Sequence, residues 1–308
     1  MEDSEVRAAA FAHCRQLMAT RPHLTSAELN EGFLFNGSRI PWVNPQQGIF
    51  KPRQMEFLLS IRTVHPAKGR RVWYDDQRNV HEQIFAGSDV VDYAFMGDDP
   101  DAFQNRWLKQ AWQAGTPIIY FLGIAPGLYL PIFPVHVVAW QPERLRIQVA
   151  FSLEDQPAAS ARLTTMDSVF ERRYALREVK QRLHQATFRE AVIEAYGGRC
   201  ALSGLPEPLL IDAAHIVSDK DERLGQPVVP NGIPLSKIHH AAFDAHLIGI
   251  DPDYRIHVAD RLLEQKDGPM LEALKQLNQR SIILPTRQRD WPDRERLALR
   301  FVEFREAA

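Results

Sequence analysis

The chain has 308 residues, about twice the length of a typical single domain, so its length favours two domains. Hydrophobic residues make up 45% and charged residues 25%, which excludes a disordered or collagen-like protein. Lysine and arginine number 37 against 39 aspartate and glutamate residues, so the net charge of −2 gives no global sign of nucleic-acid binding. Two cysteines are too few for a disulfide framework or a four-cysteine zinc cage.

No stretch of 18 consecutive apolar residues occurs, so we expect no transmembrane helix and no membrane partner. The N-terminus is acidic at its tip and lacks the apolar core of a signal peptide, which predicts a cytoplasmic protein.

The first 30 residues predict one or two helices, because their apolar residues recur at helical spacing. Pro22 ends the first helix, and the sequence from Thr25 to Glu28 resembles a capping box that opens a second. From residue 32 to residue 140, short runs rich in β-formers alternate with Gly, Pro, Asn and Asp, as is typical of a β-rich domain. A helix is expected within this region at 101–114.

Residues 153–168 are small and polar, as in a linker, and a charged helical segment follows. Positions 171–190 hold six basic residues against three acidic ones, a pattern usually seen on a solvated helix face with ion pairs; contact with DNA phosphates is the alternative. After it come a strand, a loop, a strand and a helix to about residue 251, and then a helical tail. The prediction is an α+β protein with a β-rich domain at 1–152, a linker and basic helix at 153–185, and a third segment at 186–308.

Residues 200–251 contain the candidate catalytic and metal-binding side chains. The strand pattern at 209–216 contains His215, and the turn Asn231-Gly232 leads into a second short strand. On the helix that follows, His240 and Asp244 stand at positions i and i+4, so that they share one face. A histidine, an asparagine and a histidine–carboxylate pair can hold one divalent cation, with His215 taking a proton from the attacking water. Asp212 lies on the opposite strand face from His215 and can reach the metal or orient one of its ligands.

This run resembles the HNH (ββα-metal) nuclease family, and the resemblance extends upstream through residues 182–205. It implies that the segment at 186–308 is an HNH endonuclease domain. It implies that His215 is the general base, that Asn231 braces the loop or touches the metal, and that His240 and Asp244 are metal ligands. One divalent ion per site is expected, whether Mg²⁺, Mn²⁺, Co²⁺ or Ni²⁺.

Two positions depart from the family pattern. Ala214 stands where many members carry Asp or His, and Asp212 is the available substitute. Ser203 stands where the second thiol of a zinc-binding Cys pair would be, so no structural zinc is expected and apolar packing must replace it. The packing residues expected to do so are Tyr196, Leu202, Leu205 and Phe243.

The N-terminal half has a Gly-Ile-x-x-Pro opening at 48–52, a Tyr-Asp pair, an aromatic-x-Gly step at 95–97 and an Asn-led helix. This order resembles SRA-type modified-base readers, which implies a barrel-like domain that flips a nucleotide into an aromatic pocket. The resemblance assigns Tyr74 with Tyr93 or Phe95 to stacking, and Asp75 or Asp76 to the base edge. Basic residues expected at DNA phosphates are Lys51, Arg53, Arg70, Arg71, Arg173 and Arg182.

The sequence thus predicts a modification-dependent restriction endonuclease that acts on double-stranded DNA, reads a modified base such as a modified cytosine, and works as a homodimer. One alternative is a DNA-binding protein with a degenerate HNH module, which Ala214 keeps open. Another is an HNH nuclease whose first domain reads a backbone mark or a protein.

Overall fold

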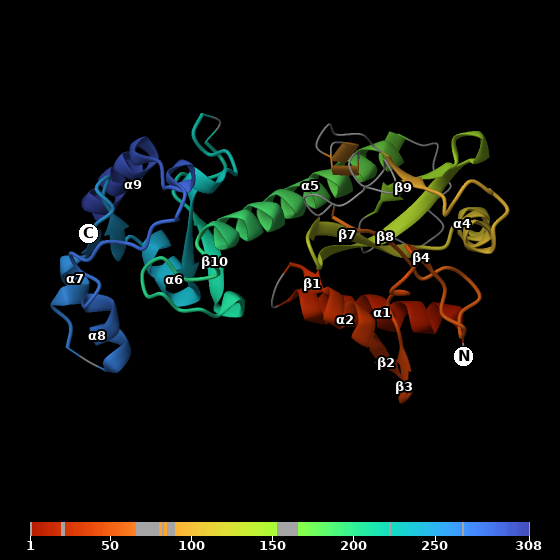
Figure 1. Cartoon of the computed structure of the whole chain (residues 1–308), viewed down its shortest axis with the longest axis horizontal. Helices are drawn as coiled ribbons and strands as arrows, with labels where there is room; N and C mark the ends of the chain where they lie inside the picture. Colours follow the sequence, from red (N-terminus) through yellow and green to blue (C-terminus); the bar gives the residue numbers. More distant parts are fainter. Residues whose placement is uncertain are drawn as a thin grey trace. The chain divides into compact units, whose positions relative to one another are not determined.

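A computed structural model describes residues 2–19, 22–65, 80–81, 83–84, 90–152, 166–221, 223–266 and 268–307 (Figure 1). The chain divides into two compact units, Met1–Ala186 and Thr187–Ala308. No helix in these described ranges is both long enough and apolar enough to cross a membrane. Five residues assigned from sequence to base or phosphate contacts lie outside the described ranges; they are Arg70, Arg71, Tyr74, Asp75 and Asp76.

Unit 1 opens with helices α1 (Asp3–Met18) and α2 (Ser26–Glu31). The predicted capping box is confirmed: the Thr25 hydroxyl accepts a hydrogen bond from the Glu28 amide at 3.3 Å, and the Glu28 carboxylate accepts one from the Thr25 amide at 2.8 Å. These bonds satisfy two main-chain amides that have no partner inside the helix, so α2 begins sharply after Thr25.

The centre of unit 1 is a seven-stranded sheet that curls into a half-barrel. Its order is β4 (Ile49–Phe50), β5 (Ser60–Thr63), β7 (Ile118–Ala125), β8 (Leu128–Gln141), β9 (Arg146–Phe151) and β6 (Val91–Ala94), and β1 (Leu24–Thr25) also pairs with β8. All pairings are antiparallel except β5–β7. A separate hairpin joins β2 (Phe33–Phe35) to β3 (Ser38–Ile40).

The sheet is covered on both faces, which explains why β7 reads as an unbroken apolar run. Tyr120 and Leu122 face one core, which includes side chains of α4 (Phe103–Ala114) and α5 (Met166–Ala195). Ile119 and Phe121 alternate with them and enter a second core beneath α1 and α2. The mixed α+β class with a barrel-like first domain is therefore confirmed.

Helix α5 begins at Met166, inside the segment that the sequence suggested as a linker. Residues 153–165 lie outside the described ranges. Ala175, Val179, Leu183 and Ala186 recur every three or four positions and are buried in the first core of unit 1. The basic segment is thus one face of an anchored helix, because its apolar stripe is packed on the sheet.

Unit 2 contains the predicted strand–strand–helix motif: β10 (Ile211–His215), β11 (Gly232–Ser236) and α6 (Lys237–Asp244). After it come β12 (Ile248–Ile250), β13 (Ile256–Val258), α7 (Asp260–Leu263), α8 (Pro269–Lys275) and α9 (Arg294–Ala307). Short 3-10 turns lie at Pro142–Arg144, Pro208–Leu210, Val229–Asn231 and Gln288–Asp290.

The expected helical tail after residue 251 is present as α7, α8 and α9, but the expectation missed the strand β13, which precedes them and forms a hairpin with β12. Asp251 makes the turn: its carboxylate accepts hydrogen bonds from the amides of Asp253 and Arg255, both at 2.9 Å. An aspartate that bonds the main chain two residues ahead stabilises a turn, and this side-chain effect is missed when only hydrophobic periodicity is considered.

Candidate active site

Strand β10 and helix α6 supply four of the five side chains predicted to form the site in unit 2; the fifth, Asn231, ends the 3-10 turn before β11. The strands β10 and β11 are antiparallel, with Asp212 opposite Leu235 and His215 opposite Gly232. Helix α6 follows β11 directly, and the Ser236 hydroxyl caps it by accepting from the His239 amide at 3.3 Å. Because no loop separates β11 from α6, the helix packs directly against β10 and β11.

His240 lies between two carboxylates. Its Nδ1 is 3.8 Å from an oxygen of Asp212, and its Nε2 is 3.3 Å from an oxygen of Asp244. The structure therefore brings together His240, Asp244 and Asp212, and it places the two carboxylates at opposite edges of the imidazole ring. The contact with His240 is the main reason why the pKa of Asp212 lies below its usual range; partial burial acts in the opposite direction.

Two arginines that the sequence interpretation did not assign to this site accompany the carboxylates. Arg189 of α5 lies 3.9 Å from Asp212 and donates to the carbonyls of Pro208 and Ile211, both at 2.7 Å. Arg300 of α9 lies 3.6 Å from Asp244. Arg189 belongs to the basic helix noticed in the sequence, whereas no sequence signal links Arg300 to a residue so distant along the chain.

The imidazole of His215 is partly buried and stacks on Phe188, with 4.1 Å between ring centroids and 18° between planes. Burial is the main reason why the pKa of His215 is lowered; the neighbouring Asp219 and Asp244 raise it and His240 lowers it further. Lowering the pKa favours the neutral imidazole near neutral pH, which is the form that can accept a proton.

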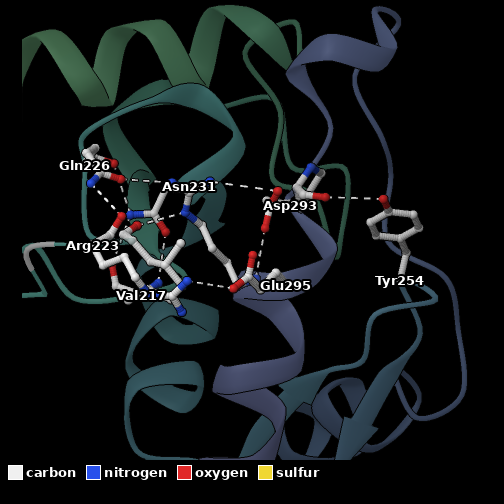
Figure 2. A network of polar contacts seen from close by, with 10 residues as sticks. Val217, Arg223, Gln226, Asn231, Tyr254, Asp293 and Glu295 are labelled. Carbon is white, nitrogen blue, oxygen red and sulfur yellow. Dashed lines mark hydrogen bonds and ion pairs between the residues drawn. The ribbon is translucent and has the colours of Figure 1, made fainter.

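Asn231 is completely buried and holds the loop that joins the two strands (Figure 2). Its carbonyl accepts from the Val217 amide at 3.0 Å, and its amide group donates to the carbonyls of Val217 at 3.0 Å and Gln226 at 3.2 Å. These three bonds use every strong donor and one acceptor site of the side chain, so Asn231 braces the loop between β10 and β11.

The same loop is tied to the C-terminal helix (Figure 2). Arg296 donates to the Leu224 carbonyl at 2.8 Å and to the Gln226 side chain at 3.1 Å, and Arg223 pairs with Glu295 at 3.0 Å. Arg296 also lies 4.0 Å from Asp293 at the start of α9. Helix α9 therefore supports the loop that Asn231 braces from within.

The two adjacent histidines of α6 have different surroundings. His239 is 9% exposed, and its Nδ1 lies 3.3 Å from the Cys200 sulfur, which also accepts from the Ser236 amide at 3.3 Å. Burial raises the pKa of the Cys200 thiol, but hydrogen bonds with His239, Ser203 and Ser236 outweigh it and lower the value to about 6. His239 thus belongs to a buried polar pair, whereas His240 faces the carboxylates.

The core around Cys200 contains the apolar residues that we expected to replace a zinc site. Tyr196, Leu202 and Phe243 are buried in it, and Leu205 packs against it partly exposed.

In the described ranges, no group of three or more His, Cys, Asp or Glu side chains has the arrangement of a metal cluster. The donor chemistry around His240 nevertheless fits a divalent cation, because Nε2 and the Asp244 carboxylate lie close together on one helix face. The Asp212 carboxylate lies at the other ring nitrogen, where a carboxylate commonly orients a metal-binding histidine.

In unit 1 the structure places two predicted pocket residues in the core. Tyr93 is 4% exposed and donates through its hydroxyl to the Gly48 carbonyl at 2.9 Å, while Phe95 is 2% exposed and packs on Trp140 at 4.4 Å between centroids. Both rings are buried in the first core of unit 1: Tyr93 lies in β6, which pairs with β9, and Phe95 directly follows β6. Tyr74, Asp75 and Asp76, their expected partners in the pocket, lie outside the described residues.

The described residues expected at phosphates are on the surface to differing degrees. Arg53 and Arg173 are exposed, whereas Lys51 and Arg182 are partly buried. Lys51 donates to the Met55 carbonyl at 2.8 Å and lies over the Trp107 ring at 5.8 Å.

Comparison with known proteins relates this site to a family. A search of the curated proteins finds no match. A solved structure of the "Modification dependent TagI restriction endonuclease" matches with a TM-score of 0.31 and 16% identity, covering 84% of this chain and 86% of that one. Residues 200–251 match the HNH endonuclease family, whose members are phosphodiester hydrolases that generally use a divalent metal ion. The segment that holds His215, Asn231, His240 and Asp244 is therefore an HNH endonuclease domain.

Proposed function

We propose that this protein is a modification-dependent DNA endonuclease whose HNH domain hydrolyses the phosphodiester bond. The observation that carries the proposal is the environment of two histidines within the matched segment. His215 has a lowered pKa, and His240 lies between the carboxylates of Asp212 and Asp244. A neutral base beside a site suited to a cation is the combination that metal-assisted hydrolysis needs.

Each residue has a role in this proposal. His215 takes the proton from the attacking water at an imidazole nitrogen. His240 and Asp244 would hold the divalent ion, and Asp212, which lies near Nδ1, would orient the His240 ring. A bound ion would supply stabilisation of the charge that develops on the leaving oxygen. Asn231 acts indirectly, because its three main-chain bonds fix the loop between the strands of the site.

Unit 1 is proposed as the reader of a modified base in double-stranded DNA. The support is the order of motifs in the sequence together with the curled half-barrel sheet. We assign base recognition to Tyr74, Asp75 and Asp76. Tyr93 and Phe95 are assigned a supporting role in the sheet, since both are buried in its core.

Joining a reader to a nuclease has a physical purpose, because contacts with phosphates carry no sequence information by themselves. Tethering raises the local concentration of the nuclease near the mark. Cutting both strands needs two active sites, so we propose that two copies pair, at least on DNA.

The proposal is tested by incubating the intact protein with plasmids that carry unmodified, methylated, hydroxymethylated or glucosylated cytosine. Mg²⁺, Mn²⁺, Co²⁺ and Ni²⁺ are each supplied in turn, and His215→Ala is run in parallel. We expect cleavage of one modified plasmid, and its loss in His215→Ala. Binding without cleavage under every metal would instead support a DNA-binding protein with an inactive HNH module. Equal cleavage of all plasmids would support a nuclease whose first domain does not read bases.

A further inference from the structure

The last turns of α5 pack against the strand pair that carries His215. Phe188 is 3% exposed and stacks on the His215 imidazole almost in parallel, at 4.1 Å between centroids. Val192, one turn further along the helix, is completely buried. An aromatic ring in face contact restrains both the position and the plane of its neighbour.

Gly232 shows how closely the helix approaches. This residue pairs with His215 across the two strands. A Cβ atom at position 232 would lie 2.4 Å from Val192 and 2.7 Å from the tip of the Phe188 ring. Both distances are shorter than real contacts allow, so any side chain here would force Val192 or Phe188 to shift. The helix and the strand pair are therefore fitted to each other at His215.

A catalytic histidine usually has its ring fixed by a hydrogen bond to a third group. His215 shows no such bond among the residues that the structure describes, and its surroundings act on it through burial and through charges at a distance. The second side-chain torsion of histidine has broad energy wells, so its ring plane is not set by the backbone. Contact with the Phe188 ring supplies the missing restraint.

We propose that Phe188 is a positioning residue, which holds the His215 imidazole in the plane from which it takes a proton from water. The proposal rests on the proposed hydrolysis for its effect on rate, but the restraint itself can be measured without any cleavage. Phe188 also covers one face of the imidazole, so water and substrate reach His215 from the remaining sides. A misplacement of about 1 Å in a catalytic group can reduce a rate by about 100-fold. A poorly restrained His215 ring would therefore lower the cleavage rate.

The test uses Phe188→Leu, which keeps an apolar side chain in the contact but removes the ring face. Val192→Ala is the matched control, because it opens space on the same helix and beside the same glycine while leaving the stacked ring. Phe188→Met, which fills irregular space well, is the second variant if Phe188→Leu does not fold. Thermal unfolding of each full-length variant establishes that its fold is intact.

Two measurements are made on these variants. The ring current of Phe188 shifts the His215 ring protons upfield in the NMR spectrum, so we expect downfield movement in Phe188→Leu and none in Val192→Ala. In single-turnover cleavage of the modified plasmid, we expect Phe188→Leu to lower the rate constant about 10- to 100-fold with unchanged DNA affinity. Val192→Ala should cleave at the parental rate.

The outcomes separate the possibilities. Unchanged His215 resonances in Phe188→Leu would overturn the stacking contact. A moved resonance with a cleavage rate equal to that of Val192→Ala would overturn the positioning role. If the parent protein cleaves no DNA at all, the proposed function fails, and the NMR shift alone then decides whether Phe188 holds the ring.

Discussion

The nuclease segment and the proposed reading segment show how differently a site can be encoded. In residues 200–251, two strands and a helix follow one another closely, and neighbours in sequence are neighbours in space. In the N-terminal unit, the two pocket candidates that the structure describes, Tyr93 and Phe95, lie in and directly after strand β6, and both turn into the core of the sheet. A compact motif therefore specifies its own geometry, whereas the role of a side chain on a sheet depends on which face its strand presents to the core.

The largest decrease in cleavage rate is expected when His240 is replaced. His240→Ala removes the nitrogen beside Asp244 and leaves two carboxylates without the imidazole between them. We expect cleavage to fall by about 1,000-fold or more, since general acid–base and metal-binding groups contribute at this level. Single-turnover cleavage measures it, with His13→Ala in unit 1 as the control. Equal rates for the two variants would mean that the site lies elsewhere.

The next largest effects are expected from two substitutions in unit 1, one of a core residue and one of a residue proposed to bind the modified base. Phe95→Ala should lower the free energy of unfolding by about 3–5 kcal/mol, because it opens a cavity beside Trp140. Tyr74→Ala should abolish the preference for modified DNA. Chemical denaturation and binding to paired modified and unmodified duplexes measure the two effects. Retained discrimination in Tyr74→Ala would remove that residue from the proposed pocket.

Asp212 tests whether a carboxylate orients the His240 ring. Asp212→Asn keeps the size of the side chain but loses the charge that faces Nδ1, and we expect cleavage to fall about 10- to 100-fold. Asp251→Asn, which changes a carboxylate on the β12–β13 hairpin, serves as the comparison. If Asp212→Asn instead removed metal binding entirely, Asp212 would be a direct ligand.

The buried pair of Cys200 and His239 should contribute to the free energy of unfolding. Cys200→Ala leaves the His239 ring without its sulfur partner, which we expect to cost about 1–3 kcal/mol in the free energy of unfolding; Cys200→Ser should cost less. The folded thiol has a pKa of about 6 against an ordinary value of 9.0. Its ionisation therefore stabilises the fold fully above pH 9, and that contribution is lost as the pH falls through about 6. Denaturation curves that do not differ between the parent and Cys200→Ala would contradict this role.

The smallest expected effect is a shift in the pH profile of cleavage. Burial lowers the pKa of His215, so the imidazole stays neutral at pH values where an ordinary histidine is already protonated. The rate should rise with pH and reach its plateau early, with the midpoint of the acid limb below 6.5. A midpoint above 6.5 would show that another group controls the rate.

These contrasts also show how far sequence reasoning reached. The capping box at Thr25, the strand of His215 and the helix of His240 were predicted correctly, because each depends on residues within a few positions of one another. Arg300 and the hairpin after residue 251 were missed, since one contact is made across the folded unit and the other depends on a side-chain turn at Asp251.

The two histidines of α6 make the same point within one helix turn. Their sequence neighbours do not indicate that His239 is buried against Cys200 while His240 faces Asp212 and Asp244. That difference follows from where α6 packs on β10 and β11. Periodicity predicts the helix, and tertiary packing decides which histidine is free to do chemistry.

The central claim is that His215 acts as the base, and chemical rescue tests it most directly. His215→Ala removes the imidazole from beside Phe188, and single-turnover cleavage of the modified plasmid is measured with increasing free imidazole. We predict that the variant is nearly inactive and that imidazole restores part of the rate in His215→Ala but not in His240→Ala. Cleavage by His215→Ala at the parental rate without imidazole would contradict the account.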